Sequence, residues 1–309
     1  MLRLLLLFLL LFFFGLSTVG AAGLNVAVSI KPIHSLVSSL MQGVAEPKLI
    51  ITASGSPHHY NLRPSEVRSL YQADLVVWVG AELESVLSKP LASRSSQQTV
   101  MALLKELPAQ QKLATREGGD WGNDEGASEA DHDHSDIDPH IWLSPDNARV
   151  ISTAIASRLA TIDPANREQY NKNLESLLNS LSELDRRAKN RLTPLQQKKY
   201  IVFHDAYQYF EKHFGLNPVG ALAIDPDRRP GARRLNEIKK SIRNMAVECI
   251  FTEPQFEPRL VSILTEGTSV RTGILDPLGA DLPPGPELYF NLISEMAASL
   301  ETCLSGNDH

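Results

Sequence analysis

The sequence predicts an α/β fold in which two similar lobes with parallel sheets are joined by one long connecting α-helix. Strand-like apolar runs alternate with helical patterns in both halves of the chain, which is typical of βαβ units. Between the halves, one amphipathic segment has no interior glycine or proline, and 309 residues are many for a single core. We therefore expect an N-terminal lobe at residues 23–162, a linking helix at 163–193 and a C-terminal lobe at 194–309.

The first half alternates in this way from its start. The expected strands are Leu24–Ile30, Lys48–Ala53 and Asp74–Gly80, and the expected helices are Ile33–Met41, Pro64–Ala73 and Pro145–Ile162. The strand Asp74–Gly80 reads DLVVWVG, and such a continuous apolar run is typical of a strand buried on both faces. The glycine and proline of residues 54–60 indicate a loop, and Ile141–Leu143 is a further strand-like run.

The linking helix is expected from Pro164 to Arg191, after a cap at Asp163, and would be roughly 40 Å long. Beyond it the alternation resumes. In chain order the strands and helices alternate as Tyr200–Phe203, His204–Phe214, Pro218–Ile224, Ala232–Met245, Val247–Thr252, Arg259–Leu264, Val270–Leu275 and Leu288–Leu304. The second half therefore predicts another parallel sheet with helices on its faces.

Residues 1–22 have the pattern of a secretory signal peptide. Arg3 is followed by an apolar run from Leu4 to Phe14 and then by small residues, so we expect cleavage after Ala21 or Ala22. The alternative is a membrane anchor, but the apolar run is short for a span. No cysteine lies near the cut, so we expect a periplasmic protein without a lipid anchor.

Charge is concentrated in one segment. Residues 116–140 contain nine acidic side chains and one arginine, a local charge that exceeds the net −6 of the chain. With no basic cluster, nucleic acid is not an expected partner. Residues 114–139 have few apolar side chains and predict a surface loop. Within it, His132 and His134 among aspartates indicate a low-affinity zinc site, with a solvated acidic linker as the alternative.

Four polar residues stand at the ends of apolar runs and are the candidate metal ligands. These are His58, His140, His204 and Asp276, two from each expected lobe. Ligands of open α/β sheets bind at the carboxyl ends of the strands, so we expect these side chains to meet in the cleft between the lobes. Three neutral imidazoles suit Zn²⁺, with Asp276 or water in the fourth position, whereas Mn²⁺ would favour more oxygen ligands. Glu253 is a candidate acceptor for a ligand imidazole N–H.

The chain has two cysteines, Cys249 and Cys303. An even count in an exported protein indicates a disulfide, and two free buried thiols are the alternative. Two cysteines without a nearby cysteine or histidine at zinc-finger spacing do not predict a structural zinc site.

Six segments resemble, in order, motifs of the ZnuA family, the periplasmic zinc-binding subunits of high-affinity zinc ABC uptake systems. These segments are residues 29–33, 57–65, 73–80, 140–145, 203–211 and 275–279. The resemblance implies a TroA-like fold and zinc ligands at His58, His140 and His204. It also places Asp276 at the family's carboxylate position and pairs Cys249 with Cys303. One departure is that the acidic loop holds only two histidines before His140, fewer than is usual in the family.

The expected function is that of a monomeric binding protein, not an enzyme. It would capture Zn²⁺ in the interlobe cleft and deliver it to an ABC permease driven by a separate ATPase, since the chain has no Walker-type glycine loop. One alternative is a zinc-dependent adhesin or buffer protein, although many of these are lipid-anchored. Another is a zinc hydrolase, which needs an open coordination position beside a general base, and the chain contains no HExxH motif.

Overall fold

Two parallel four-stranded sheets form the framework of the molecule. The computed structural model describes residues 23–52, 55–116, 137–223, 231–254 and 259–306. Within these ranges the strand orders are β2-β1-β3-β4 in the N-terminal half and β6-β5-β7-β8 in the C-terminal half, and every pair within both sheets is parallel. The predicted fold class is confirmed.

The N-terminal sheet lies among short helices. Its strands are β1 (Val26–Val28), β2 (Lys48–Leu49), β3 (Leu75–Trp78) and β4 (Thr99–Ala102), and the helices are α2 (Lys31–Leu40), α3 (Pro64–Gln72), α4 (Ser88–Ala92), α5 (Leu103–Glu106) and α6 (Pro145–Ile162). The sequence did not predict β4, α4 or α5. Strand β4 is mostly half-buried at the sheet edge and follows polar residues, so its apolar signal is weak.

The C-terminal sheet repeats the arrangement. Its strands are β5 (Lys199–His204), β6 (Asn217–Ala223), β7 (Cys249–Thr252) and β8 (Arg271–Ile274), and the helices are α8 (Gln208–Phe214), α9 (Ala232–Asn244), α10 (Arg259–Thr265) and α11 (Leu288–Ser305). The prediction that a helix begins at His204 was wrong. His204 is the last residue of β5, and α8 begins four residues later.

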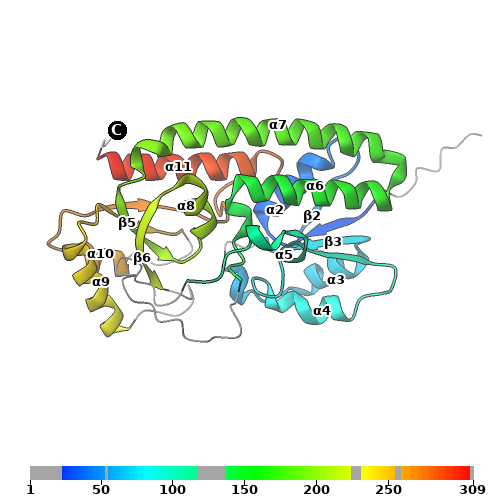
Figure 1. The fold of residues 1–309 in the computed structure, drawn as a ribbon. Coiled ribbons are helices and arrows are strands. Elements are labelled where there is room, and N and C mark those ends of the chain that lie inside the picture. The colour runs from blue at the N-terminus through cyan, green and yellow to red at the C-terminus, as the bar shows by residue number, and fades with distance from the viewer. Residues whose placement is uncertain (1–22, 53–54, 117–136, 224–230, 255–258, 307–309) are drawn as a thin grey trace, which may run out of the picture.

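Helix α7 (Arg167–Leu192) runs along one side of both halves, as Figure 1 shows. Its 26 residues span about 39 Å at the usual helical rise. The predicted start at Pro164 is a separate 3₁₀ turn, Pro164–Asn166. The buried face of α7 includes Leu177, Leu181 and Leu184, and the helix packs on α2, α6 and α11. It thus forms a common support for elements of both halves.

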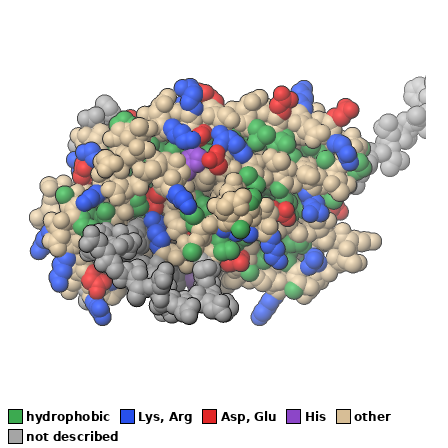
Figure 2. Space-filling view, in the orientation of Figure 1, with side chains coloured by type: hydrophobic (Ala, Val, Ile, Leu, Met, Phe, Trp, Pro, Cys, Tyr) green, Lys and Arg blue, Asp and Glu red, His purple; other side chains and the backbone are tan. Residues whose placement is uncertain are grey.

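The largest buried apolar cluster contains residues of both halves, including Trp142 from the first and Tyr207 from the second. A smaller cluster lies only in the C-terminal half and includes Phe203, Ile238 and Val261. The division of the chain at residues 162 and 193 stays a prediction. On the face seen in Figure 2, basic and acidic side chains are interspersed rather than gathered in one patch. No helix in the described ranges is long and apolar enough to cross a membrane.

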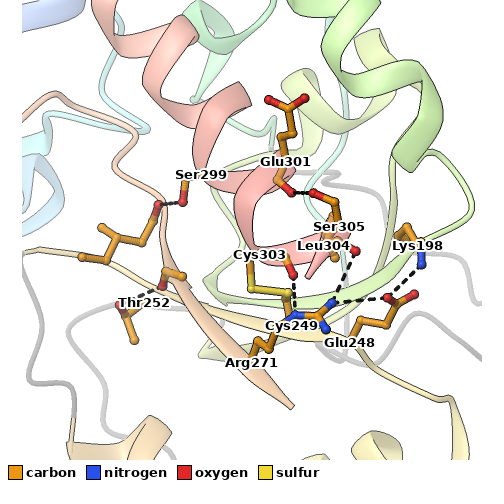
Figure 3. The surroundings of a disulfide bond; sticks show 12 residues. Lys198, Glu248, Cys249, Thr252, Arg271, Ser299, Glu301, Cys303, Leu304 and Ser305 are labelled. Carbon is orange, nitrogen blue, oxygen red and sulfur yellow. Dashed lines mark hydrogen bonds and ion pairs between the residues drawn. A yellow bond between two sulfur atoms is a disulfide. The ribbon is translucent and has the colours of Figure 1, made fainter. Parts of the chain in front are cut away.

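A disulfide joins Cys249 on β7 to Cys303 on α11 (Figure 3), which confirms the predicted pair. Both cysteines are buried. Beside the disulfide, the Arg271 guanidinium donates to the carbonyls of Cys303 and Leu304 at the carboxyl end of α11, where a cation is favourable. Disulfide and arginine together fix the last helix to the strands β7 and β8.

Candidate metal site

His58 lies in a 3₁₀ turn, Pro57–His59, that follows strand β2. The Ser56 hydroxyl accepts the backbone N–H of His58 at 3.3 Å and caps this turn, and the side chain of Pro57 is buried. This cap and the buried proline fix the turn locally. It presents a half-buried imidazole at the edge of the N-terminal sheet.

His140 lies in an irregular segment, which corrects one prediction. Ile141–Leu143 is a buried 3₁₀ turn and not a strand, and Ser144 both ends this turn and caps α6. The His140 side chain is oriented by Asp138, whose Oδ1 accepts the backbone N–H at 2.9 Å and the Nδ1–H at 2.8 Å. Both residues are buried, so this short contact fixes the ring without help from a strand.

His204 ends the central strand β5, and Glu253 directly follows the neighbouring strand β7. Glu253 Oε1 accepts the Nδ1–H of His204 at 2.6 Å, and both side chains are buried. Because β5 and β7 are paired in parallel, their carboxyl ends meet at one edge of the sheet. Glu253 thus accepts the ring N–H of a candidate ligand, and its role beside a bound metal stays a prediction.

The three imidazoles converge. The Nε2 atoms of His58 and His204 each lie 3.4 Å from Nε2 of His140, and one ligand atom from each ring lies within 4.8 Å of the other two. Zn–N bonds of about 2.0–2.1 Å in a tetrahedron place two nitrogens about 3.3–3.4 Å apart. The Nδ1 contacts to carboxylates leave the Nε2 lone pairs of His140 and His204 directed at the shared centre. This geometry fits one tetrahedral Zn²⁺.

The pKa values of the two buried rings shift in opposite directions. Burial and the neighbouring His204 lower the pKa of His140 well below its ordinary value. Burial also lowers the pKa of His204, but the charge and hydrogen bond of Glu253 outweigh it, and the net shift is upward. Burial raises the pKa of Asp138 to about 7, against the opposing effects of the His140 N–H and of Arg116. A divalent cation between the rings would offset the carboxylates buried beside them.

The predicted residues Asp276, His132 and His134 are not part of the described three-histidine group. Asp276 is absent from the three-histidine group, and its carboxylate accepts the backbone N–H groups of Leu278 and Ala280. Its role as a ligand stays a prediction. His132 and His134 lie outside the described residues. His59 lines the same cavity as His58.

Sequence reasoning missed several residues of the cleft. Asp138 holds His140, and the Arg116 guanidinium pairs with Asp205 and Glu211 beside His204. A signal for Asp138 was present, because an aspartate two residues before a candidate ligand can accept both its backbone and its ring N–H. Arg116 carried no local signal, since its partners are about ninety residues away.

The sequence model of the ZnuA family, described as zinc-uptake complex component A, periplasmic, matches residues 26–303. The chain belongs to the ZnuA family. A member from Brucella suis, the high-affinity zinc uptake system protein ZnuA, is 40% identical over 307 residues, which cover 91% of this chain and 92% of the relative. The corresponding protein of Yersinia pestis is 36% identical, with 92% of each chain covered.

Among solved structures, the periplasmic zinc-binding protein TroA of Treponema pallidum superposes with a TM-score of 0.79 at 19% identity. The match covers 92% of this chain and 99% of TroA, and it shows a common fold. Family membership makes the chain a solute-binding component of high-affinity zinc uptake and not an enzyme.

Proposed function

We propose that His58, His140 and His204 bind one Zn²⁺ through their Nε2 atoms, and that this ion is the transported cargo. The single observation that carries the proposal is the pair of 3.4 Å distances that join Nε2 of His140 to Nε2 of His58 and of His204. Two nitrogen ligands of one tetrahedral Zn²⁺ lie about this far apart. The chemistry of the donors agrees, because three imidazoles suit zinc better than a cation that prefers oxygen ligands. Asp276 or a water molecule takes the fourth position; the Asp276 carboxylate also accepts the backbone N–H groups of Leu278 and Ala280.

We also propose a partner and a location for this protein. The protein delivers Zn²⁺ to a membrane permease that is driven by a separate ATPase subunit, and it acts in the periplasm as a monomer. Residues 1–22 are removed as a signal peptide, and no lipid anchor is attached. Family membership in a periplasmic zinc-uptake complex supports the transport partners and the location.

Zinc titration by calorimetry at neutral pH tests the proposal. The wild-type protein should bind one Zn²⁺ tightly. Each of His58→Ala, His140→Ala and His204→Ala should weaken that binding by more than about 100-fold, since loss of a partner one shell further out already costs about 10–100-fold. His34→Ala is a suitable control, because His34 is a buried histidine that contacts the Pro47 carbonyl outside the cleft. Tight binding that survives the loss of any of the three ligands would refute the site.

A further inference from the structure

The two ends of the acidic loop rest on helix α8 of the C-terminal half. Ala114 and Ile137 pair in an antiparallel bridge, so the chain leaves and re-enters at one place. The Gln208 side chain, at the start of α8, donates to the Ala114 carbonyl at 2.9 Å. Helix α8 also packs on the turn Ile141–Leu143. A segment of the first half that leads to His140 is therefore held by a helix of the second half.

The Tyr209 hydroxyl joins both ends of the loop. It accepts the backbone N–H of Leu113 at 3.0 Å and donates to the backbone carbonyl of Asp138 at 2.9 Å. Only 3% of Tyr209 is exposed, so water does not readily replace these hydrogen bonds. The carboxylate of Asp138 in turn holds both N–H groups of His140. A continuous path of hydrogen bonds thus runs from α8 to a candidate zinc ligand.

A second contact ties the same loop end to the region after His204. The Arg116 Nε donates to both carboxylate oxygens of Asp205, at 3.0 and 3.1 Å, and its Nη2 donates to Glu211 at 2.8 Å. Asp205 is the residue after His204, and Glu211 lies on α8. The loop end is therefore fixed to the C-terminal half at two points, the Tyr209 hydroxyl and the Arg116 guanidinium.

We propose that Tyr209 is a positioning residue for zinc binding, which sets the place of His140 relative to His204 by holding Asp138. The proposal rests on the proposed function, since it concerns the same three histidines. Its physical reason is that residues 137–140 have no strand to fix them, whereas His204 ends a strand of a paired sheet. The helix that follows His204 in the chain thereby also places the ligand from the other half.

Tyr170 provides a matched control. Like Tyr209 it is a buried tyrosine whose hydroxyl makes a short hydrogen bond, in this case to Asp163 Oδ2 at 2.7 Å. Neither Tyr170 nor Asp163 lines the cleft that contains the three histidines. Replacement of either tyrosine by phenylalanine removes one oxygen atom and leaves the ring, so the two variants differ chiefly in what the lost hydroxyl held.

The first experiment measures zinc affinity by competition with a chromophoric chelator, and the melting temperature of the zinc-free protein by calorimetry. Tyr209→Phe should weaken zinc binding about tenfold, the lower end of the effect of an outer-shell partner. Tyr170→Phe should change it less than twofold, although both variants should melt at lower temperature. Equal zinc affinity in Tyr209→Phe and wild type would overturn the inference. Failure of the wild type to bind zinc would instead overturn the proposed function.

A second experiment tests whether Tyr209 acts through Asp138. In an Asp138→Ala background, the further change Tyr209→Phe should weaken zinc binding less than twofold, because the intermediate contact is already lost. A tenfold loss of zinc affinity on adding Tyr209→Phe to the Asp138→Ala protein would show that Tyr209 does not act through Asp138. If Asp138→Ala does not fold, Co²⁺ serves as the probe: its visible absorption bands should shift in Tyr209→Phe and not in Tyr170→Phe. Identical cobalt spectra in all three proteins would also refute the inference.

Discussion

His204 and His140 reach the same point of the molecule by different means. His204 ends a central strand, and its acceptor Glu253 follows the paired strand, so two regular elements fix the pair. His140 lies in a 3₁₀-flanked irregular segment and depends on a local aspartate and on Tyr209 from another helix. The candidate zinc site therefore combines an imidazole positioned by the sheet with an imidazole positioned by hydrogen bonds.

The largest expected effect concerns the disulfide of strand β7, which leads to Glu253 and the His204 side of the site. Replacement of Cys249 and Cys303 by serine should lower the free energy of unfolding by about 4 kcal/mol in the chain-entropy model for a loop of this length. Denaturant titration of the zinc-free protein measures it. Since Cys249 begins the strand that leads to Glu253, the loss should act on the His204 side of the site. A variant as stable as the wild type would show that α11 is fixed by packing and Arg271 alone.

The next effect compares the two acceptors directly. Glu253→Gln and Asp138→Asn should each weaken zinc binding by about 10–100-fold, because each removes the carboxylate charge that orients a ligand ring. We expect the His140 ring to change orientation more in Asp138→Asn than the His204 ring does in Glu253→Gln, since no strand supports His140. Zinc affinity and a zinc-bound crystal structure of each variant provide the measurements. Unchanged affinity in both would mean that packing alone orients the imidazoles.

This difference also explains how much the sequence could predict. His204 and Glu253 follow apolar runs that are easily recognised as strands, and the sheet topology then brings them together. His140 was identified as a ligand, but its surroundings were predicted as a strand, because three buried apolar residues in a row suit a strand or a short buried turn equally well. Tyr209 and Arg116 could not be found, since their partners are distant in the chain and polar contacts across it leave no periodic pattern.

The pH dependence of zinc binding should be set by His204. Its pKa lies above the ordinary value, whereas burial keeps the pKa of His140 well below it. A proton on His204 must leave before zinc binds, so affinity should be constant above the raised pKa of His204 and fall about tenfold per pH unit below it. Glu253→Gln removes the main cause of the raised pKa of His204. The pH below which zinc affinity falls should therefore be lower in this variant. Calorimetry or chelator competition from pH 5 to about 8 covers the range. If Glu253→Gln leaves this pH unchanged, the proton that competes with zinc is bound by a group other than His204.

The smallest expected effect is that of the acidic loop. Deletion of residues 117–136 should change the affinity of the tight site less than twofold, because Asp138, Glu253 and Tyr209, which hold His140 and His204 in place, all remain. Ile137 must be kept, since its pairing with Ala114 brings the two cut ends together and allows a short glycine turn to close them. Only the capture of additional zinc, counted as stoichiometry in the same titration, should decrease. A tenfold loss at the tight site would show that the loop, and not only its two ends on α8, takes part in placing His140.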